Sequence, residues 1–197
     1  MPQASQRGEG KPLAGMAALV IGGAGAICSE SALHLLRDGA VVMLMDRNQA
    51  MLDLIVERLR AAVPESRVES IAGDGLEADD VQAALDAAKT MLGRLDMIVA
   101  GVGGGKFQPL LMYDVEKFMK TVSLNIVPAF LAVRLGAPML ERGGSITCIS
   151  STAAANATPW MAPYMVGKAG VEQIVRAAAE ELGAAGIRVN AVRPGLT

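Results

Sequence analysis

Residues 16–28 read MAALVIGGAGAIC, a short apolar run followed directly by a cluster of glycines. A run of this length without polar residues is typical of a strand that is buried on both faces. Helical periodicity follows from Cys28 to Asp38, so the glycines lie in a turn between a strand and a helix. Small residues in such a turn let main-chain N–H groups approach a pyrophosphate. A tight turn without any ligand explains the cluster equally well.

The same alternation of strand and helix continues along the chain. After a first strand over 16–21, further strands are expected over 40–45, 68–72, 97–100, 145–149 and 187–192. The later helices are expected over 50–62, 79–92, 114–140 and 163–183, with breaks or kinks in the third of these near Pro128 and Pro138. Alternation with short connections predicts parallel strands joined by right-handed crossovers. We therefore predict a single-domain, doubly wound α/β/α sheet of Rossmann type over 13–197, after a polar, disordered lead-in over 1–12.

The composition limits the possible partners. The chain is 52% hydrophobic but only 3% aromatic, which indicates an aliphatic core, and its formal charge of −2 comes without a basic run that would favour nucleic acid. The uncharged stretch 143–167 contains prolines and hydroxyl residues, and no signal peptide is visible, so no membrane partner is expected. Cys28 and Cys148 show no metal-ligand or disulfide spacing, which favours a cytoplasmic protein without a metal. Cys28, at the start of a helix, is either a reactive thiol or a small packing residue.

Acidic residues follow the second and third strands, where parallel sheets bind their ligands. Asp46 ends the second strand, and a carboxylate there accepts hydrogen bonds from ribose hydroxyls and repels a 2′-phosphate. Arg47 follows and softens that repulsion, so the pair predicts NAD in preference to NADP. A solvated carboxylate is the alternative for Asp46. Asp74 either meets the adenine edge or forms a turn within Gly-Asp-Gly.

Tyr164 and Lys168 are four residues apart, which on a helix places them on one face. A nearby positive charge favours the phenolate and lowers a tyrosine pKa that is ordinarily near 10. Tyr164 is therefore a candidate general acid or base. Taken alone, such a pair is usually a solvated helix face.

Three further polar positions support the candidate pair. Ser150 and Ser151 end the fifth strand, where a hydroxyl can bond a substrate oxygen near Tyr164. Asn125 lies in an otherwise apolar stretch, so it is either a buried amide with specific partners or a polar residue that bends the helix. Trp160 precedes Tyr164 and either lines a substrate pocket or packs in the core or in an interface.

From Leu13 to its end, the chain resembles the short-chain dehydrogenase/reductase family. The matching landmarks, in order, are the glycine turn at 22–28, Asp74, Asn125, Ser150-Ser151, Tyr164 with Lys168, and Pro194-Gly195. The resemblance implies an NAD(P)-dependent oxidoreductase that moves hydride between the dinucleotide and a small-molecule carbonyl or secondary alcohol. The family spacing selects Ser151 as the catalytic serine. It also implies that Asn125 holds a water linking Lys168 to solvent.

The resemblance also implies where the cofactor binds. The expected positions are Gly22, Ala24, Gly25, Ile27, Asp46, Arg47, Asp74, Gly75, Ala100, Gly101, Tyr164, Lys168, Pro194 and Gly195. Lys168 has a second role in the family, binding the nicotinamide ribose. Family members commonly form homotetramers or dimers through the helices that start near 114 and 163, and the same is expected here.

The chain departs from the family pattern at two motifs. Ala26 and Cys28 replace two glycines of the turn, and residues 100–103 read AGVG in place of Asn-Asn-Ala-Gly. These changes favour an alternative, a non-catalytic relative that acts as a dinucleotide sensor or an assembly subunit. The complete set of catalytic positions opposes it. Isomerisation or elimination by the same residues is a third possibility. The family's substrate-covering segment and last strand have no counterpart in the sequence.

Overall fold

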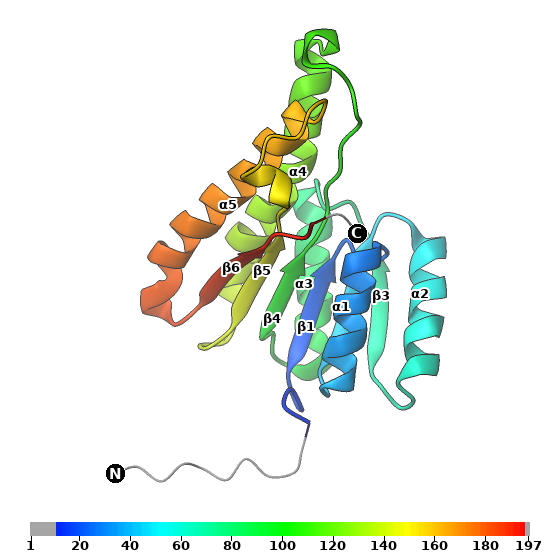
Figure 1. Cartoon of the computed structure of the whole chain (residues 1–197). Coiled ribbons are helices and arrows are strands. Elements are labelled where there is room, and N and C mark those ends of the chain that lie inside the picture. The colour runs from blue at the N-terminus through cyan, green and yellow to red at the C-terminus, as the bar shows by residue number, and fades with distance from the viewer. Residues whose placement is uncertain (1–10, 196–197) are drawn as a thin grey trace.

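The computed structural model describes residues 11–195, and their six strands form one parallel sheet in the order β3-β2-β1-β4-β5-β6 (Figure 1). The strands are β1 (Ala17–Ile21), β2 (Val41–Asp46), β3 (Val68–Ala72), β4 (Met97–Ala100), β5 (Ser145–Ile149) and β6 (Arg188–Val192). The α-helices are α1 (Ala26–Arg37), α2 (Gln49–Ala62), α3 (Ala78–Leu92), α4 (Val115–Gly136) and α5 (Ala162–Leu182). Strand order reverses between β1 and β4, which confirms the doubly wound fold.

Short 3-10 helices complete the chain: η1 (Leu110–Met112), η2 (Ala137–Met139), η3 (Thr152–Ala154) and η4 (Gly183–Ala185). Residues 1–10 of the predicted lead-in, and residues 196–197 at the other end, lie outside the described residues.

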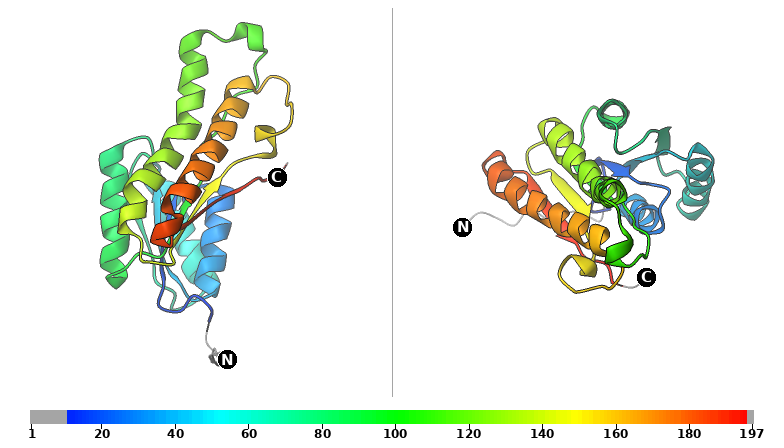
Figure 2. Two further views of the ribbon diagram at one scale, coloured as in Figure 1. Left: turned by 90° about the vertical axis from the view of Figure 1, so that its left-hand side faces the viewer. Right: turned by 90° about the horizontal axis from the view of Figure 1, so that it is seen from above.

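Alternate residues of the strands pack into two separate cores, one on each face of the sheet. In β1, Leu19 and Ile21 belong to a core shared with α3, α4 and α5, whereas Ala18 and Val20 belong to a core shared with α1 and α2. Figure 2 shows these two groups of helices on opposite faces of the sheet. All five residues of β1 are buried, as the apolar run predicts.

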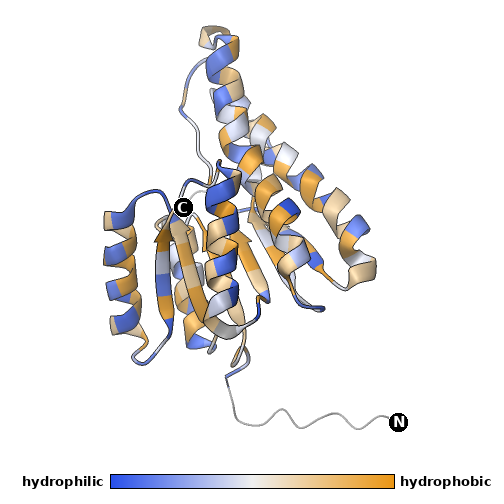
Figure 3. Ribbon diagram, turned by 180° about the vertical axis from the view of Figure 1, so that it is seen from behind, coloured by the Kyte–Doolittle hydropathy of each residue, from blue (hydrophilic) through white to orange (hydrophobic). Residues whose placement is uncertain are grey.

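The half of the sheet beyond β1 is covered differently. In β4 and β5, buried residues alternate with half-buried ones, and β6 is exposed at alternate positions. Val99, Thr147 and Asn190 are neighbours across these strands, on the face that α1 and α2 cover elsewhere. Met97 and Val99 of β4 still pack against the core under α1 and α2. Within residues 11–195, Figure 1 shows no helix over β5 and β6 on this face, so burial on both faces holds for β1 and β2 but not for these two strands. The hydropathy colouring of Figure 3 shows how apolar the central strands are.

The long helix α4 runs through Pro128 without a break, so the expected break there is wrong, whereas a kink at this residue stays a prediction. A proline inside a helix removes one N–H donor. Here the surrounding turns are held by packing, since Pro128, Ala129 and Ala132 are all buried. The regular α-helix does end before Pro138, at Gly136, where η2 begins.

By length and composition alone, the segment Val115–Met139 is apolar enough to cross a membrane. In the structure, 44% of its most apolar window is buried within the protein, and α4 packs along α5. A core helix of a globular domain meets the same criteria, and the packing explains its apolar sequence.

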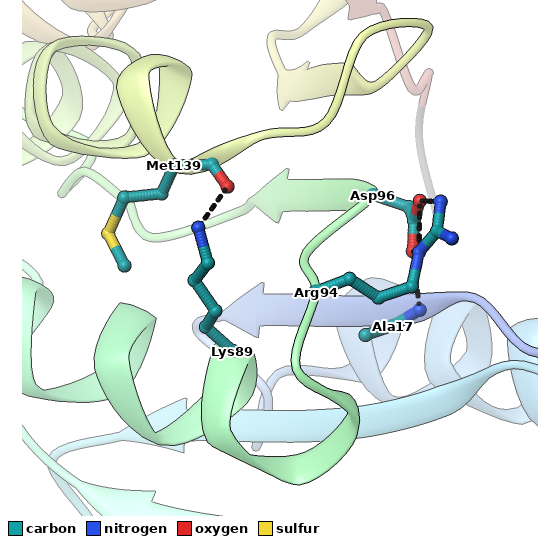
Figure 4. A network of polar contacts seen from close by, with 5 residues as sticks. All are labelled: Ala17, Lys89, Arg94, Asp96 and Met139. Carbon is teal, nitrogen blue, oxygen red and sulfur yellow. Dashed lines mark hydrogen bonds and ion pairs between the residues drawn. The ribbon is translucent and has the colours of Figure 1, made fainter.

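At the N-terminal ends of the strands, a buried carboxylate fixes the register of β1 against β4 (Figure 4). Asp96 Oδ2 accepts a hydrogen bond of 2.9 Å from the Ala17 N–H, and Arg94 donates to both carboxylate oxygens at 3.0 Å. The Asp96 N–H donates to the Ala17 carbonyl oxygen at 3.0 Å, and the Asp96 carbonyl accepts from Ser145 N–H at 2.9 Å. Asp96 therefore links the first residues of three neighbouring strands, β1, β4 and β5.

We expect Asp96→Ala to lower the free energy of unfolding by about 2 kcal/mol, because the buried Ala17 N–H loses its acceptor. Urea unfolding measures this change. Glu69→Ala is the control, because it breaks an ion pair with Arg60 whose side chains are both exposed, and the change should be much smaller. Equal losses in the two variants would contradict the assigned role of Asp96.

Candidate active site and dinucleotide crevice

A cavity of about 270 Å³ opens at the C-terminal ends of the strands, where strand order reverses. Among the expected cofactor positions, it is lined by Gly22, Gly25, Asp46, Arg47, Asp74, Gly75 and Gly101. The other expected positions do not line it: Ala24, Ile27, Ala100, Tyr164, Lys168, Pro194 and Gly195. Its remaining lining residues are not among the expected cofactor positions: Ile21, Met45, Gly73, Val102, Gly103 and Leu124.

The glycine turn is held tightly against the ends of the neighbouring strands. The N–H groups of Gly22 and Gly23 donate to the Met45 carbonyl oxygen at 2.8 and 2.9 Å. Gly22 has a φ of +85°, and a Cβ there would lie 3.0 Å from the Val102 nitrogen, so a side chain is excluded on two grounds. α1 begins directly after Gly25, and within the described residues no side chain caps its first turn. Its first N–H groups therefore suit an anion such as a pyrophosphate.

The two acidic residues at the crevice also shape its walls. Asp46 Oδ2 accepts from the Ala24 N–H at 3.3 Å and Oδ1 from the Asn48 N–H at 3.2 Å, so the carboxylate is oriented and keeps lone pairs for a ligand. Asp74 Oδ1 accepts from the Leu76 N–H at 3.0 Å, which is an Asx turn. Asp74 therefore forms the turn and also lines the crevice, and its contact with the adenine edge stays a prediction.

The departures from the family pattern at positions 28 and 101 occupy the same space. A Cβ on Gly101 would lie 2.1 Å from the Cys28 sulfur. Any larger residue at 101 therefore requires a smaller one at 28. Cys28 belongs to the core shared with α1 and α2 and is not among the residues that line the crevice.

The thiol of Cys28 is a packing group. Burial raises its pKa to about 11, with the Asp46 carboxylate acting in the same direction. The alternative of a reactive thiol with a lowered pKa is therefore wrong. Burial likewise raises the pKa of Cys148 to about 11.

Tyr164 and Lys168 face the same side of α5. The Lys168 ammonium lies 5.7 Å from the centroid of the Tyr164 ring, in a cation–π contact. It donates a hydrogen bond of 2.8 Å to the Ile149 carbonyl oxygen, and Lys168 is only 4% exposed. Burial lowers the pKa of Lys168 to about 8.

The glycine run after β4 passes between the two catalytic candidates and α4. A Cβ on Gly103 would lie 2.5 Å from Asn125 Oδ1 and 2.9 Å from Lys168 Nζ. A Cβ on Gly105 would lie 2.9 Å from the Tyr164 Cβ. Only a main chain without side chains fits there.

Asn125 is buried and holds this glycine segment in place. Its Nδ2 donates to the carbonyl oxygens of Gly104 and Thr121, both at 2.8 Å, and its Oδ1 accepts from the Gly104 N–H at 3.1 Å. The interpretation as a buried amide with specific partners therefore describes it better than that of a helix-bending residue.

The two serines after β5 have different environments. Ser150 is buried, and its hydroxyl donates to Glu172 at 2.9 Å. Ser151 is half-buried, and its hydroxyl oxygen accepts from the Ala153 N–H at 3.1 Å, which leaves its proton available. The surroundings therefore favour Ser151 as the residue that meets a substrate.

Trp160 is 61% exposed, so it is not a core residue. Its backbone lies in the left-handed region with a φ of +66°, which is uncommon for a bulky residue. Its carbonyl oxygen accepts from the Gln108 N–H at 2.8 Å. This bond joins the loop before Tyr164 to the segment after the glycine run.

Residues 16–197 match the short chain dehydrogenase family, and the chain belongs to that family. It is 29% identical over 182 residues to the 3alpha-hydroxysteroid dehydrogenase of Mediterraneibacter gnavus, covering 91% of this chain and 73% of that protein.

Solved structures agree. A short-chain type dehydrogenase/reductase from Mycobacterium ulcerans is 34% identical with a TM-score of 0.89, covering 93% of this chain and 68% of that one. NAD+-bound xylitol dehydrogenase is 26% identical with a TM-score of 0.89, covering 94% and 72%. The protein is thus an NAD(P)-dependent oxidoreductase of the short-chain class, and the non-catalytic alternative is not favoured.

We expect a strong energetic coupling between positions 28 and 101. Gly101→Ala alone should lower the free energy of unfolding by about 2 kcal/mol, because the new methyl group overlaps the Cys28 sulfur. Adding Cys28→Ala should recover most of that loss. A double-mutant cycle by urea unfolding measures the coupling, and simple additivity would exclude the shared space.

The buried ammonium predicts an unusual pH dependence of stability. The pKa of Lys168 is about 8 in the folded protein and ordinarily 10.5, so the unfolded chain binds more protons between these values. The free energy of unfolding should rise with pH through this window, by about 1 kcal/mol per pH unit. Lys168→Met should be more stable than the wild type near neutral pH, with a gap that narrows as pH rises from about 8. Urea unfolding at several pH values tests this, and a constant gap would contradict it.

Proposed function

We propose that Tyr164 is the general acid–base group for hydride transfer between NAD and a carbonyl or secondary alcohol. The observation that carries the proposal is the Lys168 ammonium against the Tyr164 ring, beside a glycine segment that borders the crevice. A positive charge at this position stabilises negative charge developing on the phenol oxygen. Tyr164 would donate its proton during reduction and accept one during oxidation.

The neighbouring residues have complementary roles in this proposal. The Ser151 hydroxyl donates to the reacting oxygen and holds it near Tyr164. Lys168 supplies the positive charge, and its pKa of about 8 lets it exchange protons near neutral pH. Asn125 holds the glycine segment against both, and Oδ1 keeps one lone pair for a water.

The crevice fits a dinucleotide, which when bound would supply or accept the hydride. Gly22, Gly25 and Gly101 line the crevice, and the start of α1 directly after Gly25 offers N–H groups to phosphate. We propose NAD over NADP because the oriented Asp46 carboxylate would repel a 2′-phosphate, although Arg47 lines the crevice beside it. The similar xylitol dehydrogenase was solved with NAD+.

The substrate is proposed to be a small cyclic secondary alcohol or its ketone, which approaches past Trp160. The support is the exposed Trp160 side chain in the loop that leads into the helix of Tyr164, together with the hydroxysteroid named for one relative. A homotetramer or dimer through α4 and α5, in the reducing cytoplasm, completes the proposal. The exposed Phe130 and Val166 on these helices, and the two free cysteines, are compatible with it.

The decisive test is Tyr164→Phe, assayed over a panel of cyclic secondary alcohols with NAD and NADP supplied separately. We expect kcat to fall by about a thousandfold, because the acid–base group is lost, while the dissociation constant for NADH stays within about twofold. Tyr113→Phe is the matched control, since its exposed hydroxyl bonds only the Lys106 carbonyl oxygen in the described structure. Unchanged turnover in Tyr164→Phe would refute the assigned role.

A further inference from the structure

A second buried carboxylate lies one helical turn beyond Lys168. Glu172 is only 7% exposed, and the Arg193 guanidinium donates to both of its oxygens. The Ser150 hydroxyl donates to Glu172 Oε1 at 2.9 Å and lies 3.2 Å from the Lys168 carbonyl oxygen. Hydrogen bonding from Arg193 holds the pKa of Glu172 below its ordinary value, so the carboxylate is ionised at neutral pH.

This carboxylate joins three parts of the site that are distant in sequence. Glu172 belongs to α5, Ser150 follows β5, and Arg193 follows β6. The main chain adds two ties between the ends of these strands, from the Ser150 N–H to the Val192 carbonyl oxygen at 2.8 Å and from the Thr152 N–H to the Pro194 carbonyl oxygen at 3.0 Å.

Ser151 itself has no hydrogen bond to α5 in the described part of the chain; its side chain bonds only within its own turn. Its distance from Tyr164 is therefore set by its chain neighbours. On the C-terminal side, η3 packs against α5 and the Thr152 N–H bonds the Pro194 carbonyl oxygen. On the N-terminal side, two residues are bonded directly by side chains of α5. These are Ile149, held by the Lys168 ammonium, and Ser150, held by Glu172. An error of about 1 Å in such a distance is enough to lower a rate substantially.

We propose that Glu172 is a positioning residue with two branches. Through Ser150 it fixes the Ser151 hydroxyl relative to Tyr164, and through Arg193 it fixes the turn at Pro194-Gly195, two of the expected cofactor positions. The first branch rests on the proposed function, whereas the second concerns dinucleotide binding alone.

The experiment separates the branches by measuring kcat, KM, the NADH dissociation constant and the thermal midpoint. The substrate is the cyclic alcohol that the wild type oxidises best. Ser150→Ala should lower kcat about tenfold while the NADH dissociation constant stays within about twofold. Arg193→Gln should weaken NADH binding about fivefold, and Arg193→Lys should recover most of that loss. Glu172→Gln should show both effects.

Asp96→Asn is the matched control. Asp96 and Glu172 each bond an arginine and a second donor, and the side chains of the two ion pairs have the same exposure, 45% and 8%. Asp96 lies at the opposite ends of the strands, so its variant should lower the thermal midpoint without changing kcat or NADH binding.

Two results would overturn the proposal. One is an unchanged kcat in Ser150→Ala together with unchanged NADH binding in Arg193→Gln. The other is a loss of kcat or of NADH binding that is simply proportional to the fall in thermal midpoint in every variant, Asp96→Asn included. Failure of the proposed function gives a different result, because Tyr164→Phe would then keep its activity. The Arg193 branch would still be tested in that case, since it is measured by NADH binding alone.

Discussion

A buried ammonium whose hydrogen-bond partner is a main-chain carbonyl, Lys168 on Ile149, is the interaction around which the site is arranged. None of the ion pairs between described residues includes Lys168. Burying a positive charge in this way is unfavourable, and the depressed pKa of Lys168 expresses that cost. The residues around the ammonium are closely packed. Gly103 leaves no room for a side chain, and Asn125 holds the glycine segment against the ammonium.

Local sequence patterns predicted the fold and the contact between Tyr164 and Lys168 well, because each depends on short spacings. Apolar runs and glycine turns gave the sheet, and a spacing of four on a helix brought Tyr164 to Lys168. The choice of Ser151 over Ser150 as the catalytic serine came from the spacing in the family. The structure gives a physical reason for the same choice, since the Ser150 hydroxyl already donates to Glu172.

The features that escaped prediction depend on contacts between distant residues. Cys28 and Gly101 look like unrelated departures until the structure shows that they share one space. Glu172 carried one available signal, its position one turn after Lys168, but nothing local indicated Arg193 as its partner. The helix α4 is not broken at Pro128, because propensity describes an isolated helix, whereas α4 is held by packing on its neighbours.

The two arginine–carboxylate pairs lie at opposite ends of the same parallel strands. Asp96 gathers the beginnings of β1, β4 and β5, and Glu172 joins the far ends of β5 and β6 to α5. Mutations can therefore alter the Asp96 pair and the Glu172 pair independently, although both belong to one sheet. Under the proposed role of Glu172, substitutions near Asp96 can change the thermal stability of the domain without altering the geometry of the reacting groups.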